Sequence, residues 1–293
     1  MNRQANAGLA FTLPVLIVTA TVLVVPTVGA LLLSATDFDI YALADLRNLR
    51  FTGGANYLEL LHTPLFWRAI GNTLLFAAIG VPAAIGTSLG VALLVHSTTV
   101  RWKPLWRLLL FAPYVTTLVA TALVWRYVLD ARTGLLNYVL SLVGIASVDW
   151  LGDPRTSIPA TLLFIVWKAF GYNMLVFTAA LATVPHELHD AARLDGARAW
   201  ARFRHVTLPA IGPSLLLAAI LSVANFLQIF TEPYVMTHGG PAQSTVTLMY
   251  FMFDQGFTWW NLGTASAVAV LLFIAILILT AVQARVGRRQ EWL

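Results

Sequence analysis

Long apolar runs with almost no charged residues limit the folding of this 293-residue chain more than any other feature. A run of about 18 or more such residues is long enough to cross a bilayer. Six runs qualify, at approximately 9–34, 69–95, 105–128, 159–182, 209–230 and 263–286. Backbone groups in hydrocarbon must bind one another, so these runs should be helices. The sequence predicts an all-α, polytopic membrane protein with about six transmembrane helices.

The composition agrees with a membrane protein and excludes several other classes. Hydrophobic residues make up 59% of the chain and charged residues 11%, whereas soluble domains carry about 25% charged residues. The chain has no cysteine, which excludes disulfides and thiolate metal sites, and we expect no metal or cofactor. The net charge of +5 is dispersed over short segments, so no nucleic-acid partner is expected.

Basic residues near the ends of the runs predict the orientation of the chain. Three segments carry them: Arg101, Lys103 and Arg107; Arg193, Arg198, Arg202 and Arg204; and Arg285, Arg288 and Arg289. Such segments stay in the cytoplasm, so both termini should be cytoplasmic. The segment at about 35–68 should then be periplasmic, and Gly53 and Gly54 supply a turn there before a small extramembrane helix. One membrane domain, 1–293, accounts for the chain.

The segment at about 183–208 predicts two short cytoplasmic helices joined by a bend. Pro185 and Glu187 suit a helix start, and Gly196 suits a left-handed bend between two helices. A face of mostly small residues recurs at three- and four-residue spacing, at Leu188, Ala191, Ala192 and Asp195. Such a face favours close packing against a partner. The alternative is an interfacial amphipathic helix whose arginines hold lipid phosphate.

This segment resembles the "EAA" loop of ABC-importer permeases. The pattern is followed position for position by Asp190-Ala191-Ala192, Asp195-Gly196-Ala197, Phe203 and Thr207-Leu208-Pro209. Asp190 stands where that family usually has Glu, which keeps the charge and shortens its reach by one methylene. Stretches at 66–73, 134–137 and 236–241 are similar to landmarks of the carbohydrate-uptake, maltose-type branch. The resemblance therefore covers nearly the whole chain.

The resemblance implies the type I importer permease fold and ATP-driven alternating access in the cell inner membrane. The loop would be a coupling helix that docks into a cleft on an ATPase. The coupling residues would be Asp190, Ala191, Ala192, Asp195, Gly196, Ala197 and Arg198. The implied partners are a second homologous permease, two copies of a cytoplasmic ABC ATPase, a periplasmic or lipid-anchored solute-binding protein, and membrane lipid.

No motif for ATP hydrolysis occurs in the chain. Neither Lys103 nor Lys168 follows a glycine, so the phosphate-binding loop G-x-x-x-x-G-K-[ST] is missing. The stretch at 86–90 has the letters of a G-x-S-x-G nucleophile elbow but lies inside an apolar run rather than at a strand-to-helix turn. We therefore expect a transport subunit that is not an enzyme, with ATP hydrolysed by a partner.

Polar residues inside the runs mark a candidate solute pathway, because such residues tend to face a bundle interior or a wet cavity. Ser222, Asn225 and Gln228 recur at three-residue spacing along one helix face. By resemblance to maltose-type relatives, solute contacts are expected at these positions and at Gly171 and Tyr172. The alternative is that these side chains only bind neighbouring helices.

Two further alternatives concern Lys168 and the solute. The Lys168 side chain is expected either to snorkel to the membrane surface or to pair with a carboxylate of another subunit. Glycerol phosphate or a polyol is as compatible with the carbohydrate branch as a sugar. An ion-coupled secondary transporter is disfavoured, because apart from Lys168 the apolar runs hold no ionisable residue in their interiors.

Overall fold

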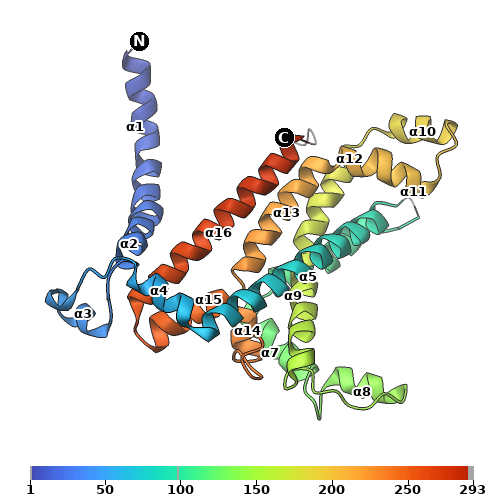
Figure 1. The fold of residues 1–293 in the computed structure, drawn as a ribbon. Coiled ribbons are helices and arrows are strands. Elements are labelled where there is room, and N and C mark those ends of the chain that lie inside the picture. Colours follow the sequence, from blue (N-terminus) through green and yellow to red (C-terminus); the bar gives the residue numbers. More distant parts are fainter. Residues whose placement is uncertain (1, 98, 290–293) are drawn as a thin grey trace. The chain divides into compact units, whose positions relative to one another are not determined.

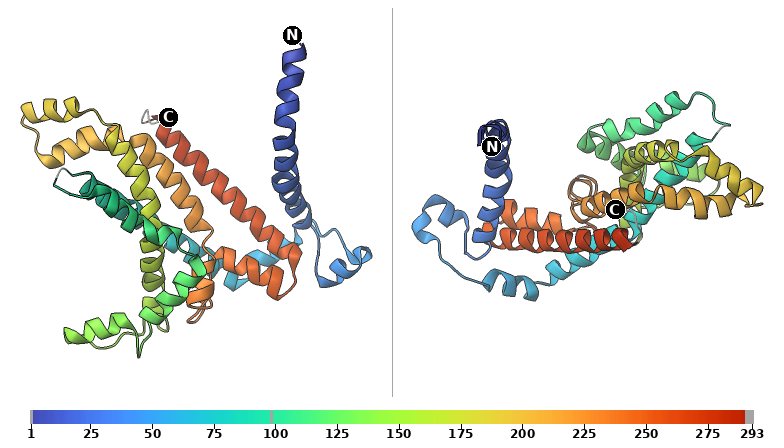
Figure 2. Two further views of the ribbon diagram at one scale, coloured as in Figure 1. Left: turned by 180° about the vertical axis from the view of Figure 1, so that it is seen from behind. Right: turned by 90° about the horizontal axis from the view of Figure 1, so that it is seen from above.

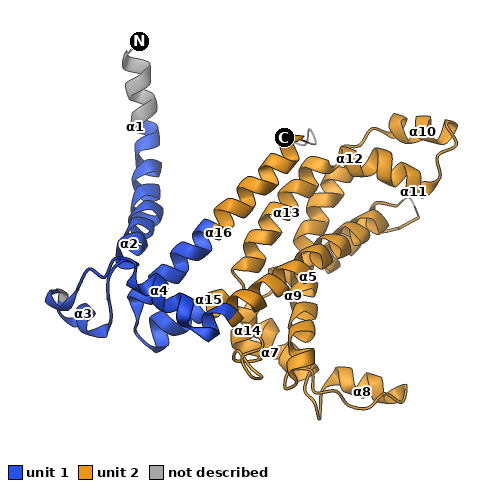
Figure 3. Cartoon of the chain, viewed as in Figure 1, with its two compact units in different colours: residues 1–67, 251–274 blue, residues 68–250, 275–293 orange. Residues whose placement is uncertain are grey.

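The computed structural model describes residues 2–97 and 99–289, which are mostly helical (Figure 1). Within that part of the chain the only β pairing is an isolated bridge between Thr36 and Phe51, which confirms the all-α prediction. The chain forms two compact units, residues 1–67 with 251–274 and residues 68–250 with 275–293 (Figure 3).

The first unit holds the N-terminal span and the extramembrane segment that follows it. The span consists of α1 (Asn2–Thr19), a π-helical turn (Ala20–Val24) and α2 (Val25–Leu33). Helices α3 (Ile40–Ala44) and α4 (Ala55–His62), with a 3-10 turn (Leu46–Asn48), follow it. They confirm the small helix expected in the segment 35–68. The Asn56 amide donates to the carbonyls of Ser34 and Thr36, both at 2.8 Å, and ties α4 to the end of the span.

The second unit packs its helices around two apolar clusters. The long helices are α5 (Pro64–His96), α9 (Pro154–Ala182), α13 (Gly212–Leu227) and α16 (Leu262–Arg289), the first and last of which extend into the other unit. The shorter ones are α6 (Lys103–Val115), α7 (Leu118–Val128), α8 (Leu135–Leu142) and α14 (Thr231–Met236). Helix α15 (Leu248–Phe253) begins in this unit, and the π turn that follows it (Asp254–Thr258) belongs to the first unit. Phe76, Phe164 and Phe226 lie in one cluster, and Met174 and Phe177 in the other.

Six spans are present in the described residues if two bent helix pairs each count as one. Four helices are long and apolar enough to cross a membrane alone. The structure differs from the sequence prediction at run 105–128, where α6 and α7 meet at 95° instead of forming one helix. Pro113 lacks an N–H, and Thr116 and Thr117 are extended, so the last turn of α6 cannot continue. A 72° bend likewise precedes α13.

Asn137 organises the loop between α7 and α9. Its side chain is 6% exposed. The amide nitrogen donates to the carbonyls of Asp130, Ala131 and Val148 at 3.3, 3.2 and 2.8 Å. The amide oxygen accepts from the N–H of Val148 at 3.2 Å and the indole N–H of Trp150 at 2.9 Å. One buried amide therefore holds together backbone from both sides of α8.

Two stretches far apart in the sequence meet at the start of α5. The Asn72 amide donates to the carbonyls of Gln243 at 3.0 Å and Val246 at 2.9 Å. Asn72 of the stretch 66–73 is thus joined to the loop that follows 236–241.

We predict that Asn137→Ala destabilises the protein, because it leaves several buried backbone groups without a partner. The expected loss is about 1–3 kcal/mol of unfolding free energy, seen as a lower thermal unfolding midpoint in detergent. Ser141→Ala is the matched control, since Ser141 is exposed on α8 and its hydroxyl binds only the carbonyl of Tyr138 in its own helix. Equal midpoints for the two variants would contradict the role assigned to Asn137.

Candidate coupling loop and membrane cavities

The loop between α9 and α13 consists of two short helices joined by a tight bend. They are α10 (His186–Leu194) and α11 (Ala199–Arg202), followed by a π-helical turn (Phe203–Thr207) and α12 (Leu208–Ala210). Both views show α10 and α11 side by side at one end of α9, with α8 at its other end (Figures 1 and 2). The predicted pair of helices is confirmed.

Gly196 makes the reversal between α10 and α11. Its φ is +74°, a left-handed conformation that side chains with a Cβ rarely adopt. The Gly196 N–H donates to the Arg193 carbonyl at 3.0 Å, and the Ala197 N–H donates to the Ala192 carbonyl at 2.9 Å. These two bonds form a Schellman motif, which satisfies the free carbonyls at the end of α10. The left-handed bend predicted at Gly196 is confirmed.

The predicted coupling residues lie on an open surface of the second unit. Asp190, Ala191, Asp195, Gly196 and Arg198 are exposed, and Ala192 and Ala197 are partly buried. A Cβ added at Gly196 would meet nothing within 4 Å. The neighbouring Leu194 side chain is 90% exposed. An exposed leucine beside small residues is a surface that a partner protein can cover closely.

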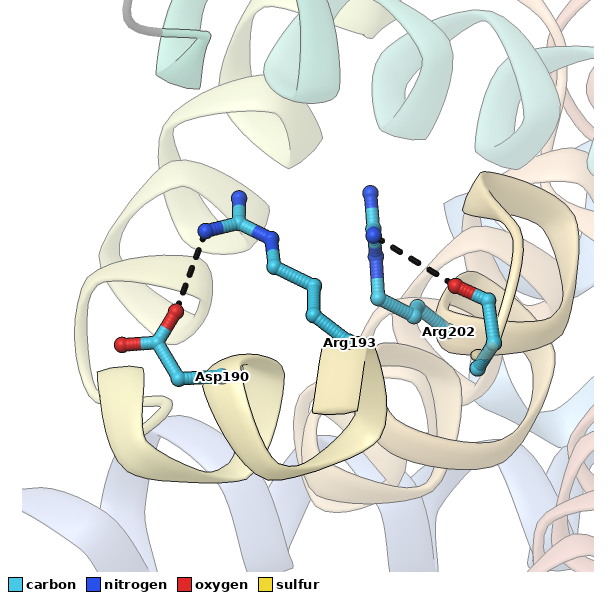
Figure 4. Close-up of polar contacts among 4 residues, drawn as sticks. Asp190, Arg193 and Arg202 are labelled. Carbon is cyan, nitrogen blue, oxygen red and sulfur yellow. Dashed lines mark hydrogen bonds and ion pairs between the residues drawn. The ribbon is translucent and has the colours of Figure 1, made fainter. Parts of the chain in front are cut away.

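The charges of this loop are paired only weakly. Asp190 contacts Arg193 at 3.0 Å across one turn of α10, and both side chains are more than half exposed (Figure 4). The Arg202 guanidinium donates to the Ala197 carbonyl at 3.5 Å. An exposed pair at this spacing contributes about 0.2–0.5 kcal/mol. Asp190 can therefore exchange Arg193 for another cation at little cost.

Two adjoining cavities open among α6, α9 and α13 in the second unit. Tyr172, Ser222 and Asn225 line the smaller one, of ≈ 250 Å³. Asn225 and Gln228 line the larger one, of ≈ 460 Å³. Both have Tyr114, Ala169 and Phe226 in common. Four of the five positions predicted for the solute pathway therefore line one or both of two adjoining cavities.

Gly171 lies elsewhere, at the contact between α9 and α6. A Cβ added there would stand 2.7 Å from the carbonyl oxygen of Leu110, so the glycine allows the two backbones to approach closely. The Tyr172 ring, next along α9, stacks on Tyr114 with centroids 5.3 Å apart. Gly171 thus positions Tyr172 at the cavity wall.

One interhelical hydrogen bond also occurs at the smaller cavity, as the alternative interpretation expects. The Asn173 amide donates to the Ser222 hydroxyl at 3.3 Å and links α9 to α13. The Gln228 amide donates to the Ala224 carbonyl of its own helix at 3.0 Å. Asn225 lines both cavities.

Lys168 joins α9 to the break between α6 and α7. Its ammonium group donates to the Pro113 carbonyl at 2.6 Å, to the Thr116 hydroxyl at 2.9 Å and to the Thr116 carbonyl. The Pro113 carbonyl belongs to the last turn of α6, where no further turn of helix supplies backbone donors, and it also accepts from the Thr116 hydroxyl at 2.7 Å. Neither of the two expectations from the sequence, snorkelling or a carboxylate partner, describes this contact with backbone carbonyls. Pro113 followed by Thr116 and Thr117 was the signal that a span broke opposite this lysine.

Comparisons with known proteins agree with one another. Residues 86–292 match the family model described as binding-protein-dependent transport system inner membrane component. The chain is 34% identical to the sulfoquinovosyl glycerol transport system permease protein SmoG of Agrobacterium fabrum, covering 87% of this chain and 83% of that protein. It is 30% identical to the trehalose/maltose transport system permease protein MalF of Thermococcus litoralis, covering 98% and 95%.

A solved structure has the same fold over nearly the whole chain. It is a chain of the bacterial alginate ABC transporter in complex with an alginate pentasaccharide-bound periplasmic protein, with a TM-score of 0.81 and 21% identity. The match covers 98% of this chain and 96% of that one.

We predict that Lys168→Met destabilises the broken span, because the Pro113 and Thr116 carbonyls would lose the ammonium donor that binds both of them. The expected loss is about 1–3 kcal/mol, measured as a lower thermal unfolding midpoint of the purified complex. Lys168→Arg, which keeps the positive charge and N–H donors, should retain most of the stability. A Lys168→Met protein as stable as the parent would show that other groups satisfy this break.

Proposed function

The chain belongs to the family of binding-protein-dependent transport system inner membrane components, and from this membership we propose that it carries a sugar or a related solute. It is a multi-pass inner-membrane transport subunit with the fold of an ABC importer permease. The observation that carries the finer proposal is the loop at 186–210, whose exposed face combines the family motif with a bend set by one glycine.

The loop is proposed to transmit movement from an ATPase to the spans. Asp190, Ala191, Ala192, Asp195, Gly196, Ala197 and Arg198 are assigned to the contact. Small exposed side chains permit close approach, while Asp190 and Arg198 supply opposite charges for directional pairing with a partner. The Schellman motif makes the pair of helices a stiff unit, and stiffness is needed if a push on α10 is to reach α13.

ATP hydrolysis is assigned to a separate subunit, of which two copies would bind the importer. The phosphate-binding motif is missing from the sequence. The other proposed partners are a second, homologous permease and a solute-binding protein, periplasmic or lipid-anchored. A periplasmic protein accompanies the alginate transporter whose fold this chain shares.

A sugar is proposed as the solute because relatives at 30% identity or more are named for glycosides and disaccharides. Tyr172, Ser222, Asn225 and Gln228 are proposed to contact it, with Gly171 placing Tyr172. The cavity joins amide and hydroxyl groups to tyrosine and phenylalanine rings, and pockets with few polar groups among aromatic walls suit small polar organic ligands. Glycerol phosphate or a polyol remains the alternative solute.

Orientation and domain boundaries complete the proposal. The basic segments assign α10 and α11 to the cytoplasm, with both termini on the same side and residues 35–68 in the periplasm. The chain is taken as a single permease domain, 1–293.

We predict that Gly196→Trp uncouples the importer, because the indole would occupy the face that meets the ATPase. Solute-stimulated ATP hydrolysis in the reconstituted complex should fall at least about tenfold, equivalent to about 1.4 kcal/mol. Gly144→Trp is the matched control. Gly144 also ends a helix at positive φ, +80°, with open space around it, but it lies at the other end of α9. Undiminished coupling in Gly196→Trp would refute the proposed contact.

We also predict that Asn225→Leu weakens solute recognition, because it removes an amide that faces both cavities. The KM for uptake in proteoliposomes should rise about tenfold, the loss expected when about 1.4 kcal/mol of polar contact is removed. Leu217→Ala, an exposed residue of the same helix, should leave KM unchanged. If both variants transport with the parent KM, Asn225 serves only helix packing.

A further inference from the structure

A third cavity lies between α5 and the loop helices. It belongs neither to the proposed ATPase contact nor to the proposed solute pathway. It has a volume of ≈ 620 Å³ and is lined on one side by Gly86, Leu89, Gly90 and Leu93 of α5. On the other side are residues of α10, α11 and the turn that follows them. All of these belong to the second unit.

The loop side of this cavity is basic. Arg193 of α10 and Arg202 of α11 both line it, and their guanidinium groups extend side by side away from the loop backbone (Figure 4). No acidic residue is among the described residues that line the cavity. Arg193 donates to Asp190 through one nitrogen, and Arg202 donates to the Ala197 carbonyl through one nitrogen. Each guanidinium group therefore retains other N–H donors for an anion.

Other basic groups strengthen the positive potential at this end of α5. His96, which ends the helix, has four neighbours in electrostatic reach: Lys103, Arg107, His186 and His189. All four are basic side chains, from α6 and α10. The cations Lys103 and Arg107 of α6 therefore add to the attraction that Arg193 of α10 and Arg202 of α11 exert on an anion.

The α5 side of the cavity is apolar and open. A Cβ added at Gly86 or Gly90 would meet no atom within 4 Å, so the pair leaves a shallow strip along the helix. Leu89 and Leu93 border the strip. Helix α5 is long and apolar enough to span the membrane, so this strip runs from the basic end of the cavity toward the hydrocarbon.

We propose that this cavity binds an anionic phospholipid of the cytoplasmic leaflet, with its phosphate between Arg193 and Arg202 and an acyl chain along Gly86, Leu89 and Gly90. Only an amphipathic anion uses both halves of the cavity, since a free phosphate would leave the apolar strip uncovered. Guanidinium groups bind phosphate oxygens through paired N–H donors, and basic pockets at the cytoplasmic ends of spans hold anionic headgroups. The lipid would brace the loop helices against α5.

Native mass spectrometry of the purified, delipidated complex tests the proposal. The probes are phosphatidylglycerol and phosphatidylcholine with identical acyl chains. The parent should retain phosphatidylglycerol about tenfold better, a difference of about 1.4 kcal/mol. Arg193→Gln with Arg202→Gln should remove that preference, whereas the double lysine variant should keep most of it. Arg204→Gln is the matched control, because Arg204 is exposed in the same loop and does not line the cavity.

Any one of the following results would overturn the proposal. The first is equal retention of the two lipids by the parent, or an unchanged preference in the double glutamine variant. The second is complete displacement of phosphatidylglycerol by inorganic phosphate, which would make this a free-anion site. The third is efficient cross-linking of Gly86→Cys to the second permease, which would make the strip a subunit interface. Gly196→Trp should retain the lipid, so failure of the coupling contact and failure of the lipid site are distinguishable.

Discussion

The structure depends on one constraint: each backbone carbonyl in hydrocarbon needs a hydrogen-bond donor from the protein. Where α6 ends at Val115, that need is met by Lys168, which reaches from α9 to the Pro113 and Thr116 carbonyls. Because the lysine serves as a cap, the span can break by 95° without exposing polar backbone. The larger of the two cavities proposed for the solute lies at this break, with Lys168 and Thr116 in its wall. A buried lysine would be costly in a bundle of straight helices. Here the Lys168 ammonium binds the backbone at the bend and lines the cavity beside it.

The loop between α9 and α13 shows a second use of backbone geometry. Gly196 reverses the chain in two hydrogen bonds, and α10 and α11 return side by side. Their small residues and Leu194 face outward, whereas Arg193 and Arg202 line a cavity against α5. One face is proposed to meet an ATPase and the other an anionic lipid. A coupling element held on both faces transmits force better than one that can tilt freely.

The solute cavities depend on residues that no single helix supplies. Tyr114, Tyr172 and Asn225 come from α6, α9 and α13, and the close approach allowed by Gly171 brings the first two rings into stacking contact. Their amides and hydroxyls lie among aromatic walls. The larger of these two cavities also has one lysine and one glutamate, Lys168 and Glu232, in its wall.

The sequence alone determined the class of fold, the paired helices of the loop and the left-handed bend at Gly196. The length of a hydrophobic run and the conformational freedom of a glycine are local properties, so both can be predicted from neighbouring residues in the sequence. The break at Thr116, the partner of Lys168 and the cavity between Arg193 and α5 were decided by tertiary structure. Each depends on which helix packs opposite which, and residues 50 or more positions apart, such as Lys168 and Pro113, meet only after folding.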